Sequence, residues 1–555
     1  TDPILFKDVS FYVFSLPFFL AVWSFAMTII TITLILTAID YFSTYLINSF
    51  KQPAVATVIA PGKPIFQPLK PSRKSLIHLA ILGSLAFFLL SIKHYLSRFS
   101  IMYSEKGIVV GAGYTDVVIF LPMVKIFMVL AVVVAILFFV WIFYFSKKFK
   151  KRHILFYILI LYFVFSFVGS TIIPNVVQNL KVSPNEINLE SPYIENNIKF
   201  TKIAYGLDKV EERDFTVSEE LSADILEKEK ETIDNVRILD YRPLIQTYKQ
   251  TQEIRLYYDL SGIDIDRYNI NGKYTQVMLA PRELAQEQIA ESAKTWVNLH
   301  MVYTHGFGVV MSPVNSVTEE GLPNYLIQDI PPVSKEDNLQ IQEPRVYYGE
   351  KDNDFVLVNT KTKEFDYPKG NTNEYISYDG KGGVKLDSFI KKLFMAIRFR
   401  DIKILFSSDI TSQSRIMFQR SIQQRISKIT PFLMLDNDPY MVIKEGKLYW
   451  IQDAYTITKN FPYSQKFRGI NYMRNSVKIV VDAYNGDVSY YVADDTDPLM
   501  NVYAKIFPNQ FKKFEAMPLK EHIRYPEDLF KVQSEIFSTY HMNDVKVFYN
   551  KEDAW

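Results

Sequence analysis

The sequence predicts an α-helical transmembrane bundle followed by an α+β extracytoplasmic domain. Three observations carry this prediction: four long apolar runs lie within residues 1–174, mixed helix and strand patterns fill residues 175–555, and basic residues concentrate in two of the links between the runs. At 555 residues the chain is also too long for one ordinary domain.

The composition excludes several classes of function. Lys and Arg total 62 against 60 for Asp and Glu, a net charge of +2, so a nucleic-acid partner is not expected. Cysteine is absent, which excludes disulfides, thiolate metal sites and a cysteine nucleophile.

The four apolar runs predict membrane-spanning helices at about 16–39, 76–94, 122–146 and 153–173. About 20 apolar residues in a helix cross a bilayer, and runs that are apolar on all sides are not amphipathic surface helices. Ionisable residues fall only near the ends of these spans, at Asp40, His78, Lys93 and Lys125. Since transport pathways usually need charges near the membrane centre, the spans are expected to act as an anchor.

The basic residues predict the orientation. The first link holds Lys51, Lys63, Lys70, Arg73 and Lys74, and the third holds Lys147, Lys148, Lys150, Lys151 and Arg152. Positive residues favour the cytoplasmic side, so residues 175–555 are expected on the outer face of the bacterial cytoplasmic membrane. The start of the chain would also lie outside, and because Thr1 is not an initiator methionine, further sequence is expected before it.

The outer half predicts strands at 253–260 and 273–279, then an amphipathic helix over 281–297. Further helices are expected at 387–398, 414–426 and 526–541. Glu445-Gly446 precedes a strand at 448–457 and indicates a hairpin. Asn485-Gly486 predicts a second hairpin over 477–494 with a type I′ turn. The acidic stretches 208–235 and 333–375 are expected to be surface loops or boundaries between two lobes.

Two histidines, His300 and His305, are candidate metal ligands. Their spacing of five places them on opposite faces of a strand and about 140° apart on a helix, so neither regular geometry lets them bind one ion. We therefore prefer histidines that are hydrogen-bonded locally, in a strand, glycine turn and second strand.

Asp494, Asp495 and Asp497 are the other candidate metal ligands, with calcium as the ion that clustered carboxylates favour. The spacing differs from that of an EF-hand, and Pro498 indicates the start of a helix, so capping is preferred and no cofactor is predicted. Asp436 and Asp438 are expected in a turn. An aromatic platform for sugars or peptides is the alternative to core packing for Tyr449, Trp450, Tyr490 and Tyr491.

Long motifs in one order carry a family resemblance. They are FYVFSLPF (11–18), YSEKGIVVGAGYTD (103–116), SPNEINLESPYIENNI (183–198), VYTHGFGVVMSPVN (302–315), DAYNGDVSYYVAD (482–494) and RYPEDLFKVQSEIFSTYHMNDVKVFYN (524–550). On these motifs the chain resembles the bacterial uncharacterised protein family 0182. The resemblance implies about seven helices before a large extracytoplasmic region, with three spans ahead of Thr1, and it implies no catalytic residues.

The preferred function is an integral protein of the bacterial cell envelope that is not an enzyme. It would be a scaffold or binding component whose outer domain recognises an envelope protein, lipid or glycan, alone or as an oligomer. One alternative is a subunit of a transporter or channel. The other is an envelope hydrolase or transferase that uses carboxylates such as Asp494 or Glu527, which requires two acids in one cleft with separated pKa values.

Overall fold

A computed structural model describes residues 1–51, 73–144, 153–217, 220–351 and 353–555. Most of the basic residues that predict the orientation, at 63, 70 and 147–152, lie outside these described residues. The chain forms two compact units. Unit 1 is Thr1–Val210, Thr458–Tyr472 and Gln533–Trp555, and unit 2 is Glu211–Ile457 and Met473–Val532.

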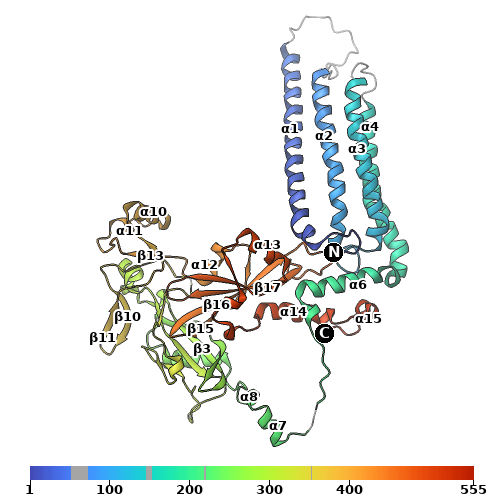
Figure 1. The fold of residues 1–555 in the computed structure, drawn as a ribbon. Helices are drawn as coiled ribbons and strands as arrows, with labels where there is room; N and C mark the ends of the chain where they lie inside the picture. Colours follow the sequence, from blue (N-terminus) through green and yellow to red (C-terminus); the bar gives the residue numbers. More distant parts are fainter. Residues whose placement is uncertain (52–72, 145–152, 218–219, 352) are drawn as a thin grey trace. The chain divides into compact units, whose positions relative to one another are not determined.

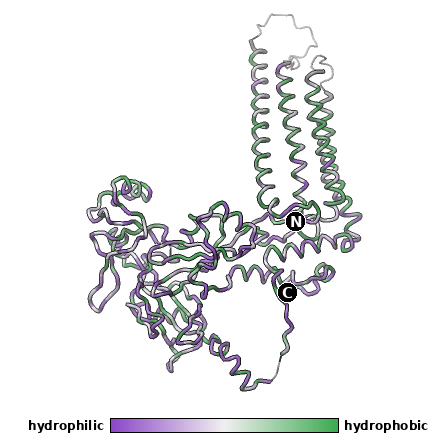
Figure 2. The backbone as a smooth tube through the Cα atoms, viewed as in Figure 1, coloured by the Kyte–Doolittle hydropathy of each residue, from purple (hydrophilic) through white to green (hydrophobic). Residues whose placement is uncertain are grey.

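The predicted apolar helices are present in unit 1 (Figure 1). They are α1 (Leu16–Lys51), α2 (Arg73–Ser97), α3 (Leu121–Tyr144) and α4 (His153–Phe167). α2 packs against α1 and α3, and α3 packs against α4. Within the described residues, four helical stretches are long and apolar enough to cross a membrane: Phe11–Thr44, Ile77–Tyr103, Asp116–Trp141 and Tyr157–Tyr205. Figure 2 shows the hydrophobic residues that run along them.

The fourth helical stretch continues past the boundary expected at residue 174. π-helical turns at Val168–Ile172 and Gln178–Val182 flank α5 (Ile173–Val177), and α6 (Glu186–Tyr205) follows. Pro174 lies in the first turn of α5, where a missing N–H is tolerated. The compact unit therefore extends to Val210 before the chain enters unit 2.

A buried asparagine joins the separate segments of unit 1. Asn197 on α6 is fully buried, and its Nδ2 donates to the carbonyl oxygens of Val110 at 2.9 Å and Tyr463 at 2.7 Å. Its Oδ1 accepts a hydrogen bond from the Tyr540 hydroxyl at 2.9 Å. α15 (Val545–Asn550) also packs against α6. Three of the motifs quoted above, 103–116, 183–198 and 524–550, therefore meet in unit 1.

Unit 2 contains two larger sheets. The strand order of the first is β1-β3-β5-β6-β7 with β2 paired to β3, and that of the second is β14-β16-β17-β18-β19 with β15 paired to β16. The strands of the first are β1 (Tyr258–Leu260), β2 (Asp264–Ile270), β3 (Lys273–Leu284), β5 (Val309–Pro313), β6 (Ile327–Gln328) and β7 (Val333–Ser334). Those of the second are β14 (Met434–Leu435), β15 (Tyr440–Lys444), β16 (Lys447–Thr458), β17 (Tyr472–Asp482), β18 (Val488–Val492) and β19 (Phe511–Lys513).

Smaller elements complete the unit. The short strands are β4 (Gly306–Phe307), β8 (Arg345–Val346), β9 (Val356–Val358), β10 (Glu364–Lys369), β11 (Thr372–Ile376), β12 (Val384–Lys385) and β13 (Arg415–Met417). The helices are α7 (Ala223–Lys228), α8 (Lys230–Ile233), α9 (Tyr241–Gln252), α10 (Phe389–Phe399), α11 (Lys403–Phe406), α12 (Ile422–Ile429) and α13 (Pro498–Ile506). α14 (Glu527–Tyr540) begins in unit 2 and ends in unit 1.

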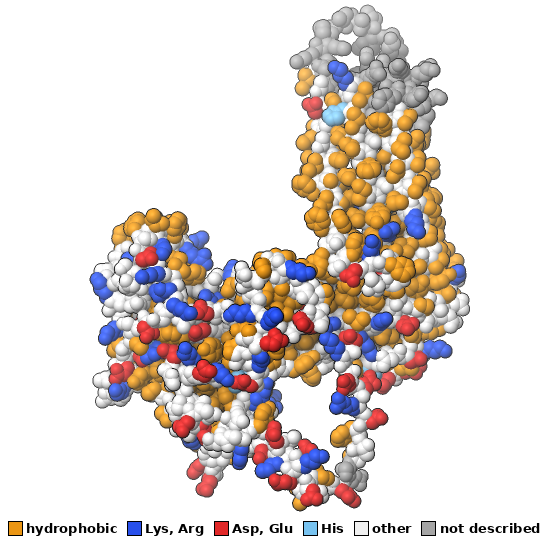
Figure 3. All heavy atoms as spheres, in the orientation of Figure 1, with side chains coloured by type: hydrophobic (Ala, Val, Ile, Leu, Met, Phe, Trp, Pro, Cys, Tyr) orange, Lys and Arg blue, Asp and Glu red, His pale blue; other side chains and the backbone are white. Residues whose placement is uncertain are grey.

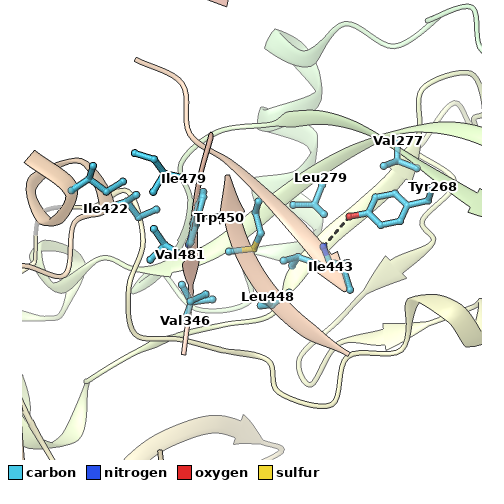
Figure 4. Close-up of a cluster of buried hydrophobic side chains, with 14 of the residues drawn as sticks. Tyr268, Val277, Leu279, Val346, Ile422, Ile443, Leu448, Trp450, Ile479 and Val481 are labelled. Carbon is cyan, nitrogen blue, oxygen red and sulfur yellow. Dashed lines mark hydrogen bonds between the residues drawn. The ribbon is translucent and has the colours of Figure 1, made fainter. Parts of the chain in front are cut away.

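The two larger sheets share one hydrophobic core. Leu279 from β3, Ile443 from β15 and Trp450 from β16 meet there, and α12 adds Ile422 (Figure 4). The Tyr268 hydroxyl accepts a hydrogen bond from the backbone N–H of Ile443 at 2.9 Å, which joins β2 to β15 (Figure 4). The core therefore fixes the first sheet against the second.

Several predicted elements are confirmed. The helices expected at 387–398 and 526–541 are α10 and α14. Glu445 and Gly446 both have positive φ and join β15 to β16 as a two-residue hairpin turn. The boundary at Val210 lies within the stretch 208–235, but it separates unit 1 from unit 2, so the division of the outer half into two lobes stays a prediction.

Two predicted helices are wrong. The residues after Pro281 continue β3 to Leu284 and then form short 3₁₀ and π turns. Pro281 pairs with Val309 of β5, and β3 is buried from Val277 to Leu284, so both of its faces are buried and no alternation of apolar and polar residues marks the strand. In 414–426 the chain forms β13, and α12 begins only at Ile422, after Gln419 takes a positive φ of 50°. The strand expected at 253–260 is confined to β1.

Candidate functional site

A polar pocket of about 220 Å³ lies in unit 2 beside the second predicted hairpin. It is lined by Glu343, Arg345, Lys447, Leu448, Asp482, Tyr484 and Asn485, and we call it the turn pocket. Its residues come from β8 and the segment before it, from the start of β16, and from the turn that joins β17 to β18. Two carboxylates and two cations therefore face one small volume.

The turn is organised by Asp482. Its Oδ1 accepts hydrogen bonds from the backbone N–H groups of Tyr484 at 2.8 Å and Asn485 at 3.0 Å, and its carbonyl oxygen accepts one from Gly486 at 2.8 Å. The hairpin is confirmed, but the type I′ turn is wrong, because only Gly486 of the pair Asn485-Gly486 has a positive φ, at 72°. The Asp482 side chain stabilises a longer turn that closes on the glycine.

Arg345 is held in place by carboxylates. Its Nε and Nη2 donate to the two oxygens of Asp366 at 2.7 and 2.8 Å, and its Nη1 donates to Glu343 Oε1 at 2.9 Å. Burial raises the pKa of Glu343, although Arg345 opposes that shift. The bidentate pair fixes the plane of the guanidinium and, through it, the position of the Glu343 carboxylate in the pocket wall.

The aromatic wall is also fixed from behind. The Tyr484 ring packs against Tyr347 and Tyr378 with centroids 5.4 and 4.8 Å apart, and its hydroxyl donates to Asp379 Oδ1 at 2.5 Å. Asn485 Oδ1 accepts from the Tyr378 hydroxyl at 2.9 Å. Lys447 is exposed, and its ammonium makes no ion pair with any residue that the structure describes, whereas Glu343 and Arg345 pair with each other.

His305 is buried, and its ring lies 4.8 Å from that of Tyr347, which packs against Tyr484 of the pocket wall. Its Nδ1 lies 3.0 Å from the carbonyl oxygen of Gly306, and its Nε2 lies 3.8 Å from Asp366 Oδ1. Burial lowers the pKa of His305 to about 4, although the Asp366 charge acts in the opposite direction. The imidazole is therefore neutral near pH 7. With Nδ1 donating to the carbonyl, the unprotonated Nε2 has no hydrogen-bond partner among the described residues.

The structure gives the two predicted histidines different partners. His300 lies in a π-helical turn, Asn298–Val302, and not on a strand; its Nδ1 is 2.8 Å from the Phe355 carbonyl oxygen and its ring stacks on Phe355 at 4.1 Å. The local hydrogen bond that was expected is found for His305, while His300 bonds a residue far away in the sequence. Across the described ranges, no group of three or more His, Asp or Glu side chains has the arrangement of a metal site.

Each aspartate of the VADDTDP segment has its own contacts. Asp497 is the N-cap of α13, where Oδ1 accepts from the Leu499 N–H at 2.9 Å and Oδ2 accepts from the Ser476 hydroxyl at 2.6 Å. The capping prediction is confirmed for this residue. Asp494 accepts from Arg474 at 3.3 Å, and the Asp495 carbonyl oxygen accepts from Asn501 at 2.9 Å.

The carboxylates named for hydrolysis lie in separate ion pairs, because Asp494 bonds Arg474 while Glu527 pairs with Lys531 at 2.6 Å. Two acids with raised pKa values, Asp264 and Glu350, were not singled out from the sequence. Burial raises the pKa of Asp264 to about 8 and, together with the charges of Asp264 and Glu283, that of Glu350 to about 9. Because β2 alternates, Asp264 shares its buried face with Tyr268 and Ile270, and this alternation in DIDRYNI is the sequence signal that could have found it.

The aromatic residues singled out from the sequence do not form a platform. Trp450, Tyr490 and Tyr491 are buried, and Tyr449 packs against the cluster of Tyr440 and Val442. Trp450 pairs across strands with Met441, and Tyr490 pairs with Ile479. They are core and cross-strand residues, which was the other reading of the pattern.

Comparison with known proteins gives a consistent result along the whole chain. The model of the uncharacterised protein family UPF0182 matches residues 1–555. UPF0182 proteins of Desulforamulus reducens and of a Sulfurovum species are each 46% identical to this chain, and the UPF0182 protein of Clostridium botulinum strain Loch Maree is 45% identical to it. All of this chain is covered in each case, but only 58–60% of the relatives' length. No solved structure matches. Because the family model covers every residue and the identities are high, the chain belongs to the uncharacterised protein family UPF0182.

Proposed function

We propose that this chain is a membrane-anchored binding component whose turn pocket holds a neutral, hydroxyl-rich group, such as one sugar unit of an envelope glycan. The observation that carries the proposal is a small pocket with charged groups of both signs, in which Asp366 holds Arg345 from outside the pocket and the backbone of the turn holds Asp482. Binding sites are pre-organised in this way, because the ligand then does not have to order the side chains that it meets.

The size and charge of the pocket select the ligand class. A volume of about 220 Å³ is smaller than the ~300–1,000 Å³ of pockets for drug-sized ligands, so it fits one ring of a longer molecule. Glu343 and Asp482 balance Arg345 and Lys447, which favours a neutral ligand over an ion. Hydroxyl groups both donate to carboxylates and accept from cations, and the Tyr484 ring offers an apolar face.

The carboxylates of the pocket favour recognition over catalysis. Both oxygens of Asp482 accept hydrogen bonds from the turn, Oδ2 from Asn485 Nδ2 at 3.0 Å, and Glu343 Oε1 accepts from Arg345. A general acid or base must exchange its proton with the substrate, whereas these groups are engaged in holding the pocket wall. Asp264 and Glu350, whose pKa values are raised, are outside the pocket lining.

A binding titration tests the pocket. The full chain in detergent is titrated with a neutral probe, tetra-N-acetylchitotetraose, by isothermal calorimetry. We expect saturable binding that Lys447→Ala weakens by roughly tenfold, because a hydrogen bond to a charged group contributes about 1.5–3 kcal/mol. Lys363→Ala, at another exposed lysine of unit 2, is the matched control. Absence of saturable binding, or an equal effect of both substitutions, contradicts the proposal.

The proposed function also includes a membrane anchor formed by the apolar helices. We place α1–α4 across the cytoplasmic membrane and residues 175–555 outside it, supported by the apolar helices and by the basic first and third links. The chain has no cysteine, so a single cysteine at Lys74 or Lys513 reports its own side. A membrane-impermeant maleimide should label Lys513→Cys in intact spheroplasts and Lys74→Cys only after permeabilisation. The reverse pattern contradicts this orientation.

A further inference from the structure

Unit 2 carries an exposed apolar surface on α10 and α11. Phe389, Ile390, Phe394 and Ile397 on α10 are 62–66% exposed, and Ile402 and Phe406 are 65% and 74% exposed. We call residues 385–406 the α10–α11 tip. Figure 3 shows hydrophobic side chains gathered over these helices with Lys and Arg side chains beside them. Such a group of exposed apolar side chains marks an interaction site in a folded protein.

The opposite side of the tip is well packed, so the exposed face is not the surface of a loosely folded segment. Ala396 and Ile404 are buried in a cluster with Leu357 and Ile416, and Phe399 packs against that cluster. Ser388 caps α10 by accepting a hydrogen bond from the Lys391 N–H at 3.4 Å. The helix is therefore rigidly held while its outer face has no covering element among the described residues.

The charges around the apolar face are mainly positive. The basic residues of the tip are Lys385, Lys391, Lys392, Arg398, Arg400 and Lys403, and the acidic ones are Asp387 and Asp401. Six positive and two negative charges give a net charge of +4, against +2 for the whole chain. Both acids are engaged: Asp387 pairs with Lys391 at 2.8 Å, and Asp401 accepts from Trp296 Nε1 at 2.5 Å.

A helix with a rigid apolar face of Phe, Ile and Leu and a rim of Lys and Arg is typical of an element that lies in the membrane interface. Protein interfaces tend to be depleted in lysine, whereas anionic headgroups attract it. In the part of the chain that the structure describes, four helices are apolar and long enough to cross a bilayer. We propose that the α10–α11 tip docks on an anionic lipid bilayer, with its apolar side chains at the boundary between headgroups and acyl chains.

This docking is distinct from the turn pocket, since the tip contains none of the residues that line it. It gives unit 2 its own membrane contact in addition to the candidate spans of unit 1. The proposal concerns the chemistry of the surface that the tip meets, and it holds whether or not the pocket binds a glycan.

Spin labelling of the full chain tests the proposal, because no native cysteine competes for the label. Phe394→Cys carries a nitroxide in nanodiscs of phosphatidylcholine with about one third phosphatidylglycerol. Asn371→Cys, exposed between β10 and β11, is the control. Collision with oxygen should dominate at position 394, and collision with a water-soluble nickel complex should dominate at position 371. Equal access to the nickel complex at both positions overturns the proposal.

A second pair of variants separates lipid from protein as the occupant. Lys391→Gln and Lys403→Gln should each lower the ratio of docked to undocked label roughly fivefold, since a basic residue near an anionic surface contributes about 1 kcal/mol. Pure phosphatidylcholine should weaken docking in the same way. A label at position 394 that is immobile, shielded from both relaxation agents and insensitive to lipid charge identifies a protein partner or a second copy, and refutes the membrane assignment.

Discussion

Replacing Asn197 by alanine should destabilise unit 1 more than any substitution of a comparable polar residue on the same helix surface. The side chain is fully buried on α6 and makes three hydrogen bonds, to Val110, Tyr463 and Tyr540. These partners belong to three other segments of the chain. Alanine removes the donors of two bonds and the acceptor of the third, so every one of these connections is lost together.

The magnitude follows from the groups that are left behind. Each buried polar group that loses its partner costs about 1–3 kcal/mol. The Val110 and Tyr463 carbonyl oxygens lose theirs, whereas the Tyr540 hydroxyl keeps a hydrogen bond with Thr201. We therefore expect a loss of about 3 kcal/mol, which lowers the melting temperature by roughly 6–12 °C for a body of this size.

Differential scanning fluorimetry of the full chain in detergent, with limited proteolysis to follow unit 1, measures the effect. Asn196→Ala is the matched control, since Asn196 is the same residue type one position earlier and is only half-buried. Tyr540→Phe leaves the two carbonyl bonds intact and should cost about 1 kcal/mol. If Asn197→Ala and Asn196→Ala shift the melting temperature equally, the hydrogen bonds of Asn197 do not join the segments of unit 1.

Three further predictions concern unit 2. Gly486→Ala should destabilise the unit by about 1–3 kcal/mol and abolish ligand binding, because the glycine has a φ of 72° and a Cβ would meet the Tyr348 ring at 2.5 Å; unchanged thermal stability would be incompatible with this turn. The pKa of buried His305 is about 4 when folded and near 6.5 when unfolded, so the unfolded state binds more protons between these values. The neutral imidazole contributes about 3 kcal/mol to the free energy of unfolding above pH 6.5, and this contribution is lost as the pH falls towards 4. Urea titrations should therefore show a free energy of unfolding that depends less on pH between these values in His305→Gln than in the parent chain. Parallel curves for the two proteins would contradict a buried neutral imidazole. Asp497→Ala should lower the free energy of unfolding by about 1–2 kcal/mol, because α13 loses its cap. Calcium or EDTA should leave the melting temperature of the parent chain unchanged. A rise in melting temperature with calcium that Asp497→Ala removes would instead support the metal-site hypothesis.

The sequence predicts well those features that depend on residues close together along the chain. Long charge-free runs have no other stable environment than a membrane or a large core, so the apolar helices are visible directly. The Glu445-Gly446 hairpin and the Asp497 cap also depend on neighbours within a few residues. The helix expected after Pro281 fails because β3 lies between β1 and β5, and burial of both faces removes the alternation that marks a strand.

Most of the candidate site could not be predicted from the sequence. The turn pocket joins Glu343, Lys447 and Asp482, which are far apart along the chain and meet only when β8, β16 and β17 are in place. The hairpin at Asn485-Gly486 marked one wall, but no local pattern indicates that Arg345 would be fixed by Asp366. The α10–α11 tip is an intermediate case, since its helix was predicted and only the packing of its inner face shows that the apolar outer face stays exposed.

The hydrogen bonds of Asn197 have a consequence for biosynthesis. Its partner Tyr540 lies 343 residues further along the chain, and at about 5–20 residues per second the ribosome needs roughly 20–70 s to make that interval. During this time α6 has been synthesised, but its buried amide has no partner from the C-terminal segment. Nascent chains that stop before Tyr540 would carry the apolar helices while one of the three hydrogen bonds of Asn197 is missing.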